Sequence, residues 1–467
     1  MIADLKPYPA LKDSGVPWLG EVPEHWAVRR IKTLFREKDE RSGTGSGVLL
    51  SLTRAKGIVP QTEASKRIAS AEDLSKYRVC RPGDLVMNRM QAWSGMFALS
   101  TYAGVISPDY SIFGAIDKSD VKFYEHLFKA PIVVDQFAQR SKGIGSGFNR
   151  LYTPDFGAVS AIVPPLSEQV AIVRFLDYAD RRIRHYILAK QKLIKLLEEQ
   201  KQAIIHRAVT RGLSPNVRLK PSGVEWLGDV PEHWEVKRNG RLFAQRNQTG
   251  FGDLPILEVS LKTGVRIRAF DNSIRKQVMS DRGKYKRAAK GDIAYNMMRM
   301  WQGAVGVAPV DGLVSPAYVV ARPFEGVEVR YFSNLFRTSA YMREVDSCPR
   351  GIVKDRNRLY WEDFKQIFSP CPPLDDQIRI AEAIDENTRT INGGIGRTLA
   401  EIDLLREFRT RLIADVVTGK LDVRAAAAKL PDETDESELL DDAEVLTEGG
   451  EETEDTDLDA VTEEAEA

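Results

Sequence analysis

The chain has 467 residues, 43% of them hydrophobic and 29% charged, so it can bury a large core and is too long for one ordinary domain. No apolar run approaches the roughly 20 residues of a membrane-spanning helix, and the N-terminus has no signal-peptide pattern, which predicts a cytoplasmic protein without a membrane anchor. The three cysteines, Cys80, Cys348 and Cys371, are widely spaced and fit reduced thiols better than a metal site.

The balanced net charge hides an asymmetry along the chain. From residue 431 onward there are 18 of the 67 acidic residues and no Lys or Arg, so residues 1–430 carry 67 basic against 49 acidic side chains. A body this basic predicts a polyanionic partner, most simply nucleic acid. The acidic end lacks aromatic residues and any sustained apolar period, which predicts a disordered tail.

A seventeen-residue motif near the start of the chain returns 208 positions later. Residues 14–30 and 222–238 share 13 of 17 positions, including the run Trp-Leu-Gly-x-Val-Pro-x-His-Trp. We refer to these two segments as the opening motifs. Their Pro and Gly residues predict turns, and their paired Trp side chains are expected to clamp each turn against the segment that follows.

The same offset of 208 persists through the body of each half, which indicates one duplicated unit. Short β-branched or aromatic segments at 48–52, 85–88 and 105–113 predict strands, and residues 121–137 and 329–345 predict helices under the sheet. The matching positions include Gly83-Asp84 with Gly291-Asp292, Asn88 with Asn296, Trp93 with Trp301, and Asn149-Arg150-Leu151-Tyr152 with Asn357-Arg358-Leu359-Tyr360.

Each half then runs into a long helical pattern that starts with Pro-Pro-Leu-x-x-Gln, at residues 164–169 and 372–377. Ser167 and Asp375 are predicted N-cap residues, each followed by an acid that suits the positive end of the helix dipole. Over about forty residues the apolar positions recur every three or four residues, which predicts a coiled-coil seam.

These patterns predict a mixed α and β (α+β) fold with two domains related by a pseudo-twofold axis and separated by two long antiparallel coiled-coil helices. The second helix must return alongside the first, because only then does a duplicated chain place its halves about such an axis. The predicted boundaries are 1–166 for the first domain, 167–213 for the central helix, 214–374 for the second domain, 375–424 for the C-terminal helix and 425–467 for the acidic tail.

Catalytic motifs are missing from the sequence. An adenine methyltransferase needs an Asn- or Asp-Pro-Pro-aromatic tetrapeptide, but both Pro-Pro pairs here follow Val163 or Cys371 and precede Leu. The Gly-x-Gly-x-Gly runs at 43–47 and 143–147 are predicted to be flexible loops, because their repeat copies lack the glycines. There is no phosphate-binding loop and no His-Glu-x-x-His, and we expect His25 and His233 to be structural residues beside Trp.

The paired opening motifs, the paired Pro-Pro-Leu-x-x-Gln helix starts and the half-repeat organisation resemble the specificity subunit of a type I restriction-modification system, over nearly all of residues 14–424. The resemblance implies a DNA-binding subunit without chemistry of its own, in which each half is a target recognition domain for one part of a split sequence. It also implies that the helices set the spacer and hold two methyltransferase subunits, which bind S-adenosylmethionine for adenine N6 methylation, while motor-nuclease subunits complete the restriction complex. No cofactor is expected in this chain.

For direct reading of double-stranded DNA, the candidates are side chains that can donate to base edges, because Arg and Lys suit guanine and Asn and Gln suit adenine. For each one, contact with a phosphate is the commoner role. The recurrence of Asn88 and Asn296 favours a shared structural role for those two. The candidates are Arg54, Lys56, Asn88, Arg89, Gln91, Lys142 and Asn149 in the first half and Lys262, Arg266, Arg268, Asn296, Arg299, Gln302, Lys354 and Arg356 in the second.

Two other interpretations stay open at this point. The chain could be a pseudosymmetric adaptor that binds two methyltransferase-like partners with little DNA specificity of its own. It could also be a self-contained methyltransferase, although the missing tetrapeptide argues against this. Binding of DNA with and without the methyltransferase distinguishes the first alternative, and binding of S-adenosylmethionine by the isolated chain distinguishes the second.

Overall fold

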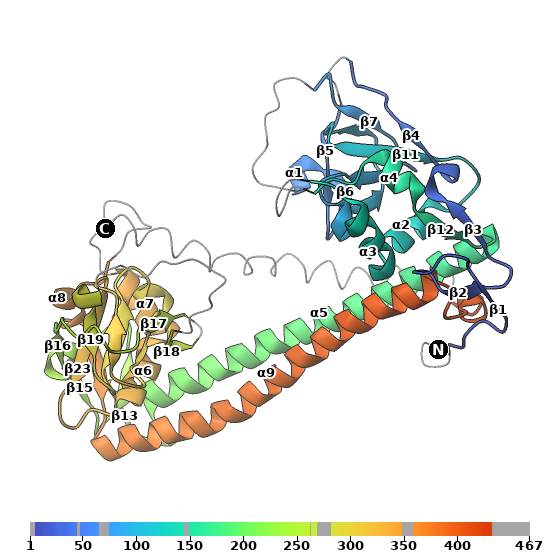
Figure 1. The fold of residues 1–467 in the computed structure, drawn as a ribbon. Coiled ribbons are helices and arrows are strands. Elements are labelled where there is room, and N and C mark those ends of the chain that lie inside the picture. The colour runs from blue at the N-terminus through green and yellow to red at the C-terminus, as the bar shows by residue number, and fades with distance from the viewer. Residues whose placement is uncertain are drawn as a thin grey trace. The chain divides into compact units, whose positions relative to one another are not determined.

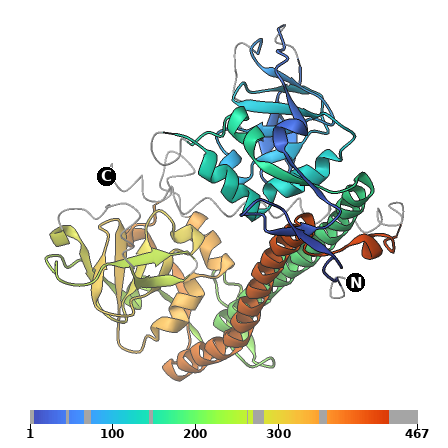
Figure 2. The ribbon, with the colours of Figure 1, turned by 45° about the vertical axis from the view of Figure 1, so that its right-hand side comes forward.

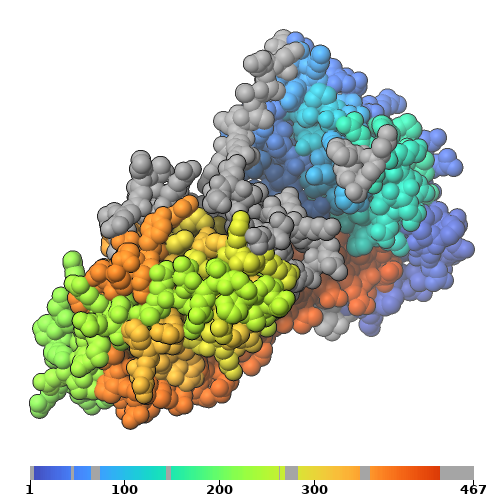
Figure 3. Space-filling view, turned by 60° about the vertical axis from the view of Figure 1, so that its left-hand side comes forward, coloured from blue at the N-terminus to red at the C-terminus, as the bar shows by residue number. Residues whose placement is uncertain are grey.

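The computed structural model describes residues 5–43, 47–64, 74–143, 149–261, 263–268, 282–347 and 358–431. Residues outside these ranges, which include the predicted acidic tail from residue 432 and most of both Gly-x-Gly-x-Gly runs, are grey in Figure 3. The chain divides into two compact units. The described part of the first unit is residues 5–190 with 400–431, and that of the second is residues 191–399.

The first unit is built around a four-stranded antiparallel sheet, with α2 (Val121–Lys129) and α3 (Pro131–Arg140) near it (Figure 1). The strand order is β4 (Phe35–Lys38), β11 (Tyr110–Ala115), β8 (Leu85–Asn88) and β9 (Phe97–Leu99). Four two-stranded antiparallel pairs surround it: β1 (Leu11–Asp13) with β2 (Glu21–Pro23), β3 (Ala27–Arg30) with β12 (Ser160–Val163), β5 (Leu50–Thr53) with β6 (Gly57–Pro60), and β7 (Arg78–Cys80) with β10 (Gly104–Ile106).

The second unit repeats this topology strand for strand. Its four-stranded sheet has the order β16 (Phe243–Arg246), β23 (Tyr318–Pro323), β20 (Ile293–Asn296) and β21 (Val305–Val307). The register also repeats, since Asn88 pairs with Tyr110 in the first sheet and Asn296 with Tyr318 in the second. The smaller pairs are β13 (Leu219–Pro221) with β14 (Asp229–Pro231), β15 (Glu235–Arg238) with β24 (Phe368–Cys371), β17 (Leu257–Ser260) with β18 (Gly264–Ile267), and β19 (Lys286–Ala288) with β22 (Gly312–Val314).

The helix predicted over 121–137 is wrong in one respect, because it is two helices, α2 (Val121–Lys129) and α3 (Pro131–Arg140). Pro131 forces the preceding Ala130 out of the helical region, to φ −66° and ψ 133°. The predicted helix 329–345 is likewise α6 (Val329–Phe336) and α7 (Ser339–Ser347). Here Thr338 interrupts the helix, since its Oγ1 donates to the Leu335 carbonyl at 2.7 Å.

The strand predicted over 105–113 is also two strands, β10 and β11. The break is a turn in which the Tyr110 backbone N–H donates to the Ser107 carbonyl at 3.0 Å. Pro108 lies inside this turn and has no N–H to offer a neighbouring strand. The other short α-helices among the described residues are α1 (Gln61–Ala64), α4 (Thr153–Ala158), α8 (Trp361–Phe364) and α10 (Arg424–Ala427).

Two long helices, α5 (Leu166–Arg211, 46 residues) and α9 (Leu374–Val417, 44 residues), run antiparallel within each unit (Figures 1 and 2). In the first unit Lys190 Nζ lies 2.5 Å from Glu401 Oε2, and in the second Lys201 Nζ donates to Asn392 Oδ1 at 2.8 Å. The predicted seam is confirmed, because its apolar positions are buried or half-buried in both helices.

The predicted N-caps are displaced by the proline pairs. The helices begin at Leu166 and Leu374, so Ser167 and Asp375 lie within the first turn and not before it. The Pro165 carbonyl accepts from the N–H groups of residues 168 and 169, because the fixed φ of proline already suits the start of a helix. The predicted mixed α and β fold class with two long helices is confirmed.

Aromatic side chains dominate the core of each unit. In the first unit Trp26, Phe128 and Phe156 are at most 1% exposed, and Trp26 comes from the opening motif. In the second unit Trp234 and Phe364 play the same part at equivalent positions. Large buried rings of this kind supply much of the apolar burial that stabilises each unit.

Candidate nucleic-acid interface

A turn of eight residues begins at Asn88, the last residue of the central strand β8 of the first unit, and side-chain hydrogen bonds to the backbone fix its shape. Asn88 Oδ1 accepts from the Met90 N–H at 3.0 Å, and Trp93 Nε1 donates to the Met90 carbonyl at 2.8 Å. The turn contains the 3₁₀ helix η3 (Ala92–Ser94) and closes on Gly95 at φ 81°, a left-handed conformation that favours glycine. We call residues 88–95 the first reading turn.

The second unit contains the same turn after β20. Asn296 Oδ1 accepts from the Met298 N–H at 2.9 Å, and Trp301 Nε1 donates to the Met298 carbonyl at 2.9 Å. The 3₁₀ helix η6 (Met300–Gln302) ends at Gly303, whose φ is 86°. These bonds confirm a shared structural role for the two Asn residues, and residues 296–303 form the second reading turn.

Two predicted cations of the first unit lie on the β5–β6 hairpin beside the first reading turn. Arg54 Nη2 donates to Ser94 Oγ at 3.0 Å, which joins the hairpin to the turn. Lys56 is exposed in the same hairpin. Exposed cations next to a turn with donor side chains have the composition of a surface that contacts DNA phosphates and bases.

Three more candidates of this half are Arg89, Lys142 and Asn149. Arg89 donates to the carbonyls of Pro108 and Asp109 at 2.7 and 3.0 Å, so its side chain braces a neighbouring loop. Lys142 is 69% exposed at its side chain and pairs with Asp155 at 3.0 Å, and Asn149 is half-buried. The segment that carries Asn149 reaches the turn through one backbone bond, in which the Leu151 N–H donates to the Arg89 carbonyl at 2.9 Å.

In the second unit, the described candidates divide between β18 and the second reading turn. Arg299 and Gln302 belong to the turn, where Arg299 is half-buried and Gln302 is exposed. Arg266 on β18 forms an ion pair with Glu258, and Arg268 directly follows β18 and is half-buried. The candidates Lys262, Lys354 and Arg356 lie outside the described residues.

A second cluster in the first unit joins the opening motif to the start of α5. Glu168 is 7% exposed and accepts from Trp26 Nε1 at 2.9 Å and from the Tyr8 hydroxyl at 3.1 Å. His25 Nε2 lies 2.6 Å from Glu168 Oε1, and Nη1 of Arg424, which follows α9, lies 3.5 Å from the same oxygen. Burial, and then the charge of Glu168, raise the pKa of Tyr8, so the hydroxyl remains a donor.

The equivalent cluster of the second unit is more exposed. His233 Nε2 lies 2.9 Å from Asp376 Oδ2, and Arg379 also pairs with this carboxylate. Burial alone would raise the pKa of Asp376, but hydrogen bonds from His233 and Arg379 outweigh it and lower this pKa below its usual value. The prediction that His25 and His233 have structural roles agrees with both contacts, although each His pairs with an acid as well as lying near Trp.

The Gln of each Pro-Pro-Leu-x-x-Gln start has a structural role that the residue pattern alone did not reveal. Gln169 Oε1 accepts from the Asp120 N–H at 2.8 Å, and its Nε2 donates to the Pro164 carbonyl at 2.8 Å. Gln377 repeats this with Glu328 and Pro372. Its recurrence at the offset of 208 was the signal available in the sequence.

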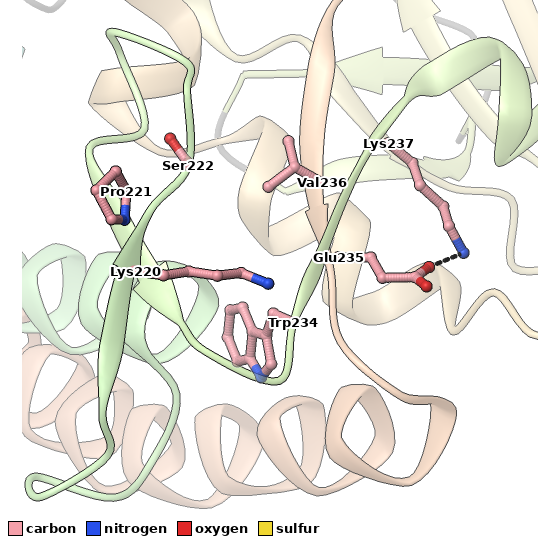
Figure 4. Close-up of a pocket in the computed structure, with 7 residues that line it drawn as sticks. All are labelled: Lys220, Pro221, Ser222, Trp234, Glu235, Val236 and Lys237. Carbon is pink, nitrogen blue, oxygen red and sulfur yellow. Dashed lines mark ion pairs between the residues drawn. The ribbon is translucent and has the colours of Figure 1, made fainter.

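A hollow of about 430 Å³ lies against the opening motif of the second unit (Figure 4). Its lining includes Lys237, which pairs with Glu235 at 2.5 Å, and Ser222, whose Oγ donates to the Val224 carbonyl at 3.1 Å. The Ser222 hydroxyl is thus used within the turn.

Two further observations concern the described residues alone. They contain no cluster of three or more His, Cys, Asp or Glu side chains placed to hold a metal ion. Within those same ranges, none of the helices combines the length and the apolar character needed to span a membrane.

Comparison with known proteins gives a consistent set of relatives. A protein of Methanocaldococcus jannaschii, assigned as the specificity subunit of the type I restriction enzyme MjaX, is 21% identical over 443 residues, covering 87% of this chain and 96% of that protein. The specificity subunit of the EcoKI type I restriction enzyme of Escherichia coli K12 is 20% identical over 367 residues, covering 71% and 74%. No family model matches the chain.

The fold is also similar to a solved structure from work on complex assembly and conformational transition of the type I R-M system. The TM-score is 0.63 at 16% identity, covering 86% of this chain and 99% of the other. The resemblance to type I specificity subunits that the sequence motifs indicate is therefore confirmed.

Proposed function

We propose that this chain is the sequence-specific DNA-binding subunit of a type I restriction-modification complex and that each unit reads one part of a bipartite target. The relatives are type I specificity subunits, which supports a role in DNA sequence specificity. The observation that carries the proposal is the repeated reading turn, with the same backbone geometry but different polar side chains in the two units, Gln91 and Ser94 in the first and Arg299 and Gln302 in the second.

The long helices set the distance between the two half-sites in this proposal. A helix of 46 residues is about 69 Å long at 1.5 Å per residue. This exceeds one turn of B-DNA, roughly 34 Å, so a pair of such helices is long enough for a reader of split sites.

The helices also provide surface for two methyltransferase subunits, which supply the S-adenosylmethionine site and the adenine chemistry. Large apolar side chains are exposed on both helices, among them Tyr186 at 49%, Leu404 at 64% and Phe408 at 42% in the first unit. The second unit exposes Leu196 and Leu399 at 53% and 49%. Exposed apolar groups on a helix pair favour a protein partner.

The experiment is a binding selection with random-sequence DNA duplexes. The purified chain with its methyltransferase, and the methyltransferase alone, are each incubated with the pool, and bound DNA is separated on a gel and sequenced. The proposal predicts enrichment of two short motifs at a fixed gap only when this chain is present. A pseudosymmetric adaptor would form the complex but enrich no sequence, and that result would refute the proposal.

A further inference from the structure

The two reading turns share one backbone and differ at few positions that face outward. Position 92 and its counterpart 300 are buried Ala and Met, both 0% exposed, so they face the core. Arg89 braces the loop at Pro108, and its counterpart Met297 packs against the core of the second unit. The side chains at these positions therefore stabilise the fold and do not face outward.

The outward positions are 91 and 94 in the first turn and 299 and 302 in the second. Gln91 and Arg299 are the N-cap residues of η3 and η6, and Ser94 and Gln302 are the last residues of these helices, so we refer to each pair as the edge of its turn. Gln91 and Gln302 are exposed, and Ser94 and Arg299 are half-buried. The first edge carries Gln and Ser, and the second carries Arg and Gln.

Gln91 and its counterpart Arg299 carry different hydrogen-bonding groups, as reading of different bases requires. A Gln carboxamide pairs bidentately with adenine, and an Arg guanidinium pairs bidentately with the O6 and N7 atoms of guanine. Asn88 Nδ2 donates to Gln91 Oε1 at 3.3 Å, but a carboxamide oxygen has two lone pairs and can accept a second bond. In the part of the chain that the structure describes, the Arg299 side chain makes no hydrogen bond or ion pair.

The backbone that carries this position is fixed and nearly identical in the two units. Gln91 has φ −125° and ψ 6°, and Arg299 has φ −125° and ψ 14°. Both turns are held by the Asn and Trp bonds to one Met residue described above. A rigid, repeated frame with one variable donor side chain is the arrangement needed to present different donors to DNA at one place.

We infer that Gln91 and Arg299 are equivalent specificity-determining residues, which read one base each in the two halves of the DNA target, Gln91 an adenine and Arg299 a guanine. This inference rests on the proposed function, since it takes each unit to read one half-site. Arg54 and Lys56 beside the first turn then contact phosphate and set affinity for any sequence.

The test exchanges the two residues separately, as Gln91→Arg and Arg299→Gln, in cells that carry the chain with its methyltransferase, and maps methylated adenines across the genome. Gln91→Arg should change the preferred base at one position of one half-site from adenine to guanine, by about tenfold or more, and leave the other half-site unchanged. Arg299→Gln should make the reciprocal change in the other half-site.

Lys56→Gln is the matched control, because it replaces an exposed side chain on the neighbouring hairpin. It should lower methylation evenly across sites without altering either motif. Thermal unfolding of the purified variants should match that of the wild type, since Gln91 is exposed and Arg299 is only half-buried. If the wild type methylates a bipartite motif and neither exchange alters that motif, the inference is wrong and the proposed function stands. The same holds if a folded variant complex loses methylation evenly at all sites. A wild type without a bipartite motif would instead overturn the proposed function.

Discussion

Glu168 provides the sharpest test of how the opening motif is attached to the long helix. Glu168→Ala removes the acceptor of two buried donors, Trp26 Nε1 and the Tyr8 hydroxyl, whose residues are 0% and 4% exposed. An unsatisfied buried donor costs about 1–3 kcal/mol, so two should lower the free energy of unfolding of the first unit by about 3 kcal/mol or more. The partly exposed His25 adds little to this.

The equivalent substitution in the second unit, Asp376→Ala, is the matched control. Its partners His233 and Arg379 have side chains that are 52% and 70% exposed, so the loss should stay below about 1 kcal/mol. Urea unfolding is followed by hydrogen–deuterium exchange, with peptides of β3 and β12 for the first unit and of β15 and β24 for the second. Equal losses in the two variants would refute the reasoning that burial of the donors decides the effect.

Four further predictions follow from the same structure. Arg54→Ala and Lys56→Ala should each weaken binding to random DNA, measured by fluorescence anisotropy. Each should also reduce the slope of the logarithm of the binding constant against the logarithm of salt concentration by about 1. An unchanged slope would exclude phosphate contact. Gly419→Ala should destabilise the first unit, because the φ of Gly419 is +78° and an added Cβ would lie 2.4 Å from Pro23 Cδ. Gly393→Ala should instead raise the free energy of unfolding by about 1 kcal/mol, because Gly393 lies on α9 with open space around it. Melting temperatures that shift in the same direction in both variants would contradict this. Because the pKa of Asp376 is lowered, its contacts stabilise the second unit at pH values above the ordinary carboxyl pKa of about 4, and this contribution is lost as pH falls through the lower pKa of the folded state. Asp376→Asn should remove that part of the dependence of unfolding free energy on pH. An identical dependence in the variant and the wild type would count against it. Adding seven residues to each long helix lengthens it by about 10 Å, so the methylated half-sites should move apart by about three base pairs, and a constant gap would argue against a helical spacer.

The sequence predicted the parts of the fold that repeat. The duplicated opening motifs, the Gly-Asp and Asn positions and the helix seam could all be located, because identity at one offset marks the residues that both units need. Asn88 and Asn296 illustrate this, since each accepts a bond from a backbone N–H in the same turn.

Other features depend on contacts between segments far apart in the sequence. Glu168 looked like an acid suited to a helix dipole, and only the fold shows that Tyr8, His25 and Trp26 converge on it. The breaks at Ala130 and Thr338 were missed because the apolar period continues across them. Arg89 and Gln91 looked alike as candidates, and the structure separates them, since Arg89 braces a loop while Gln91 faces outward.

The most direct measurement of the central claim is a genome-wide map of N6-methylated adenine in cells that express this chain with its methyltransferase, compared with cells that lack the chain. The account predicts methylation at one split motif, with two short specific parts and a fixed gap of unspecified bases. Methylation at a single contiguous site, or the same pattern with and without the chain, would contradict it.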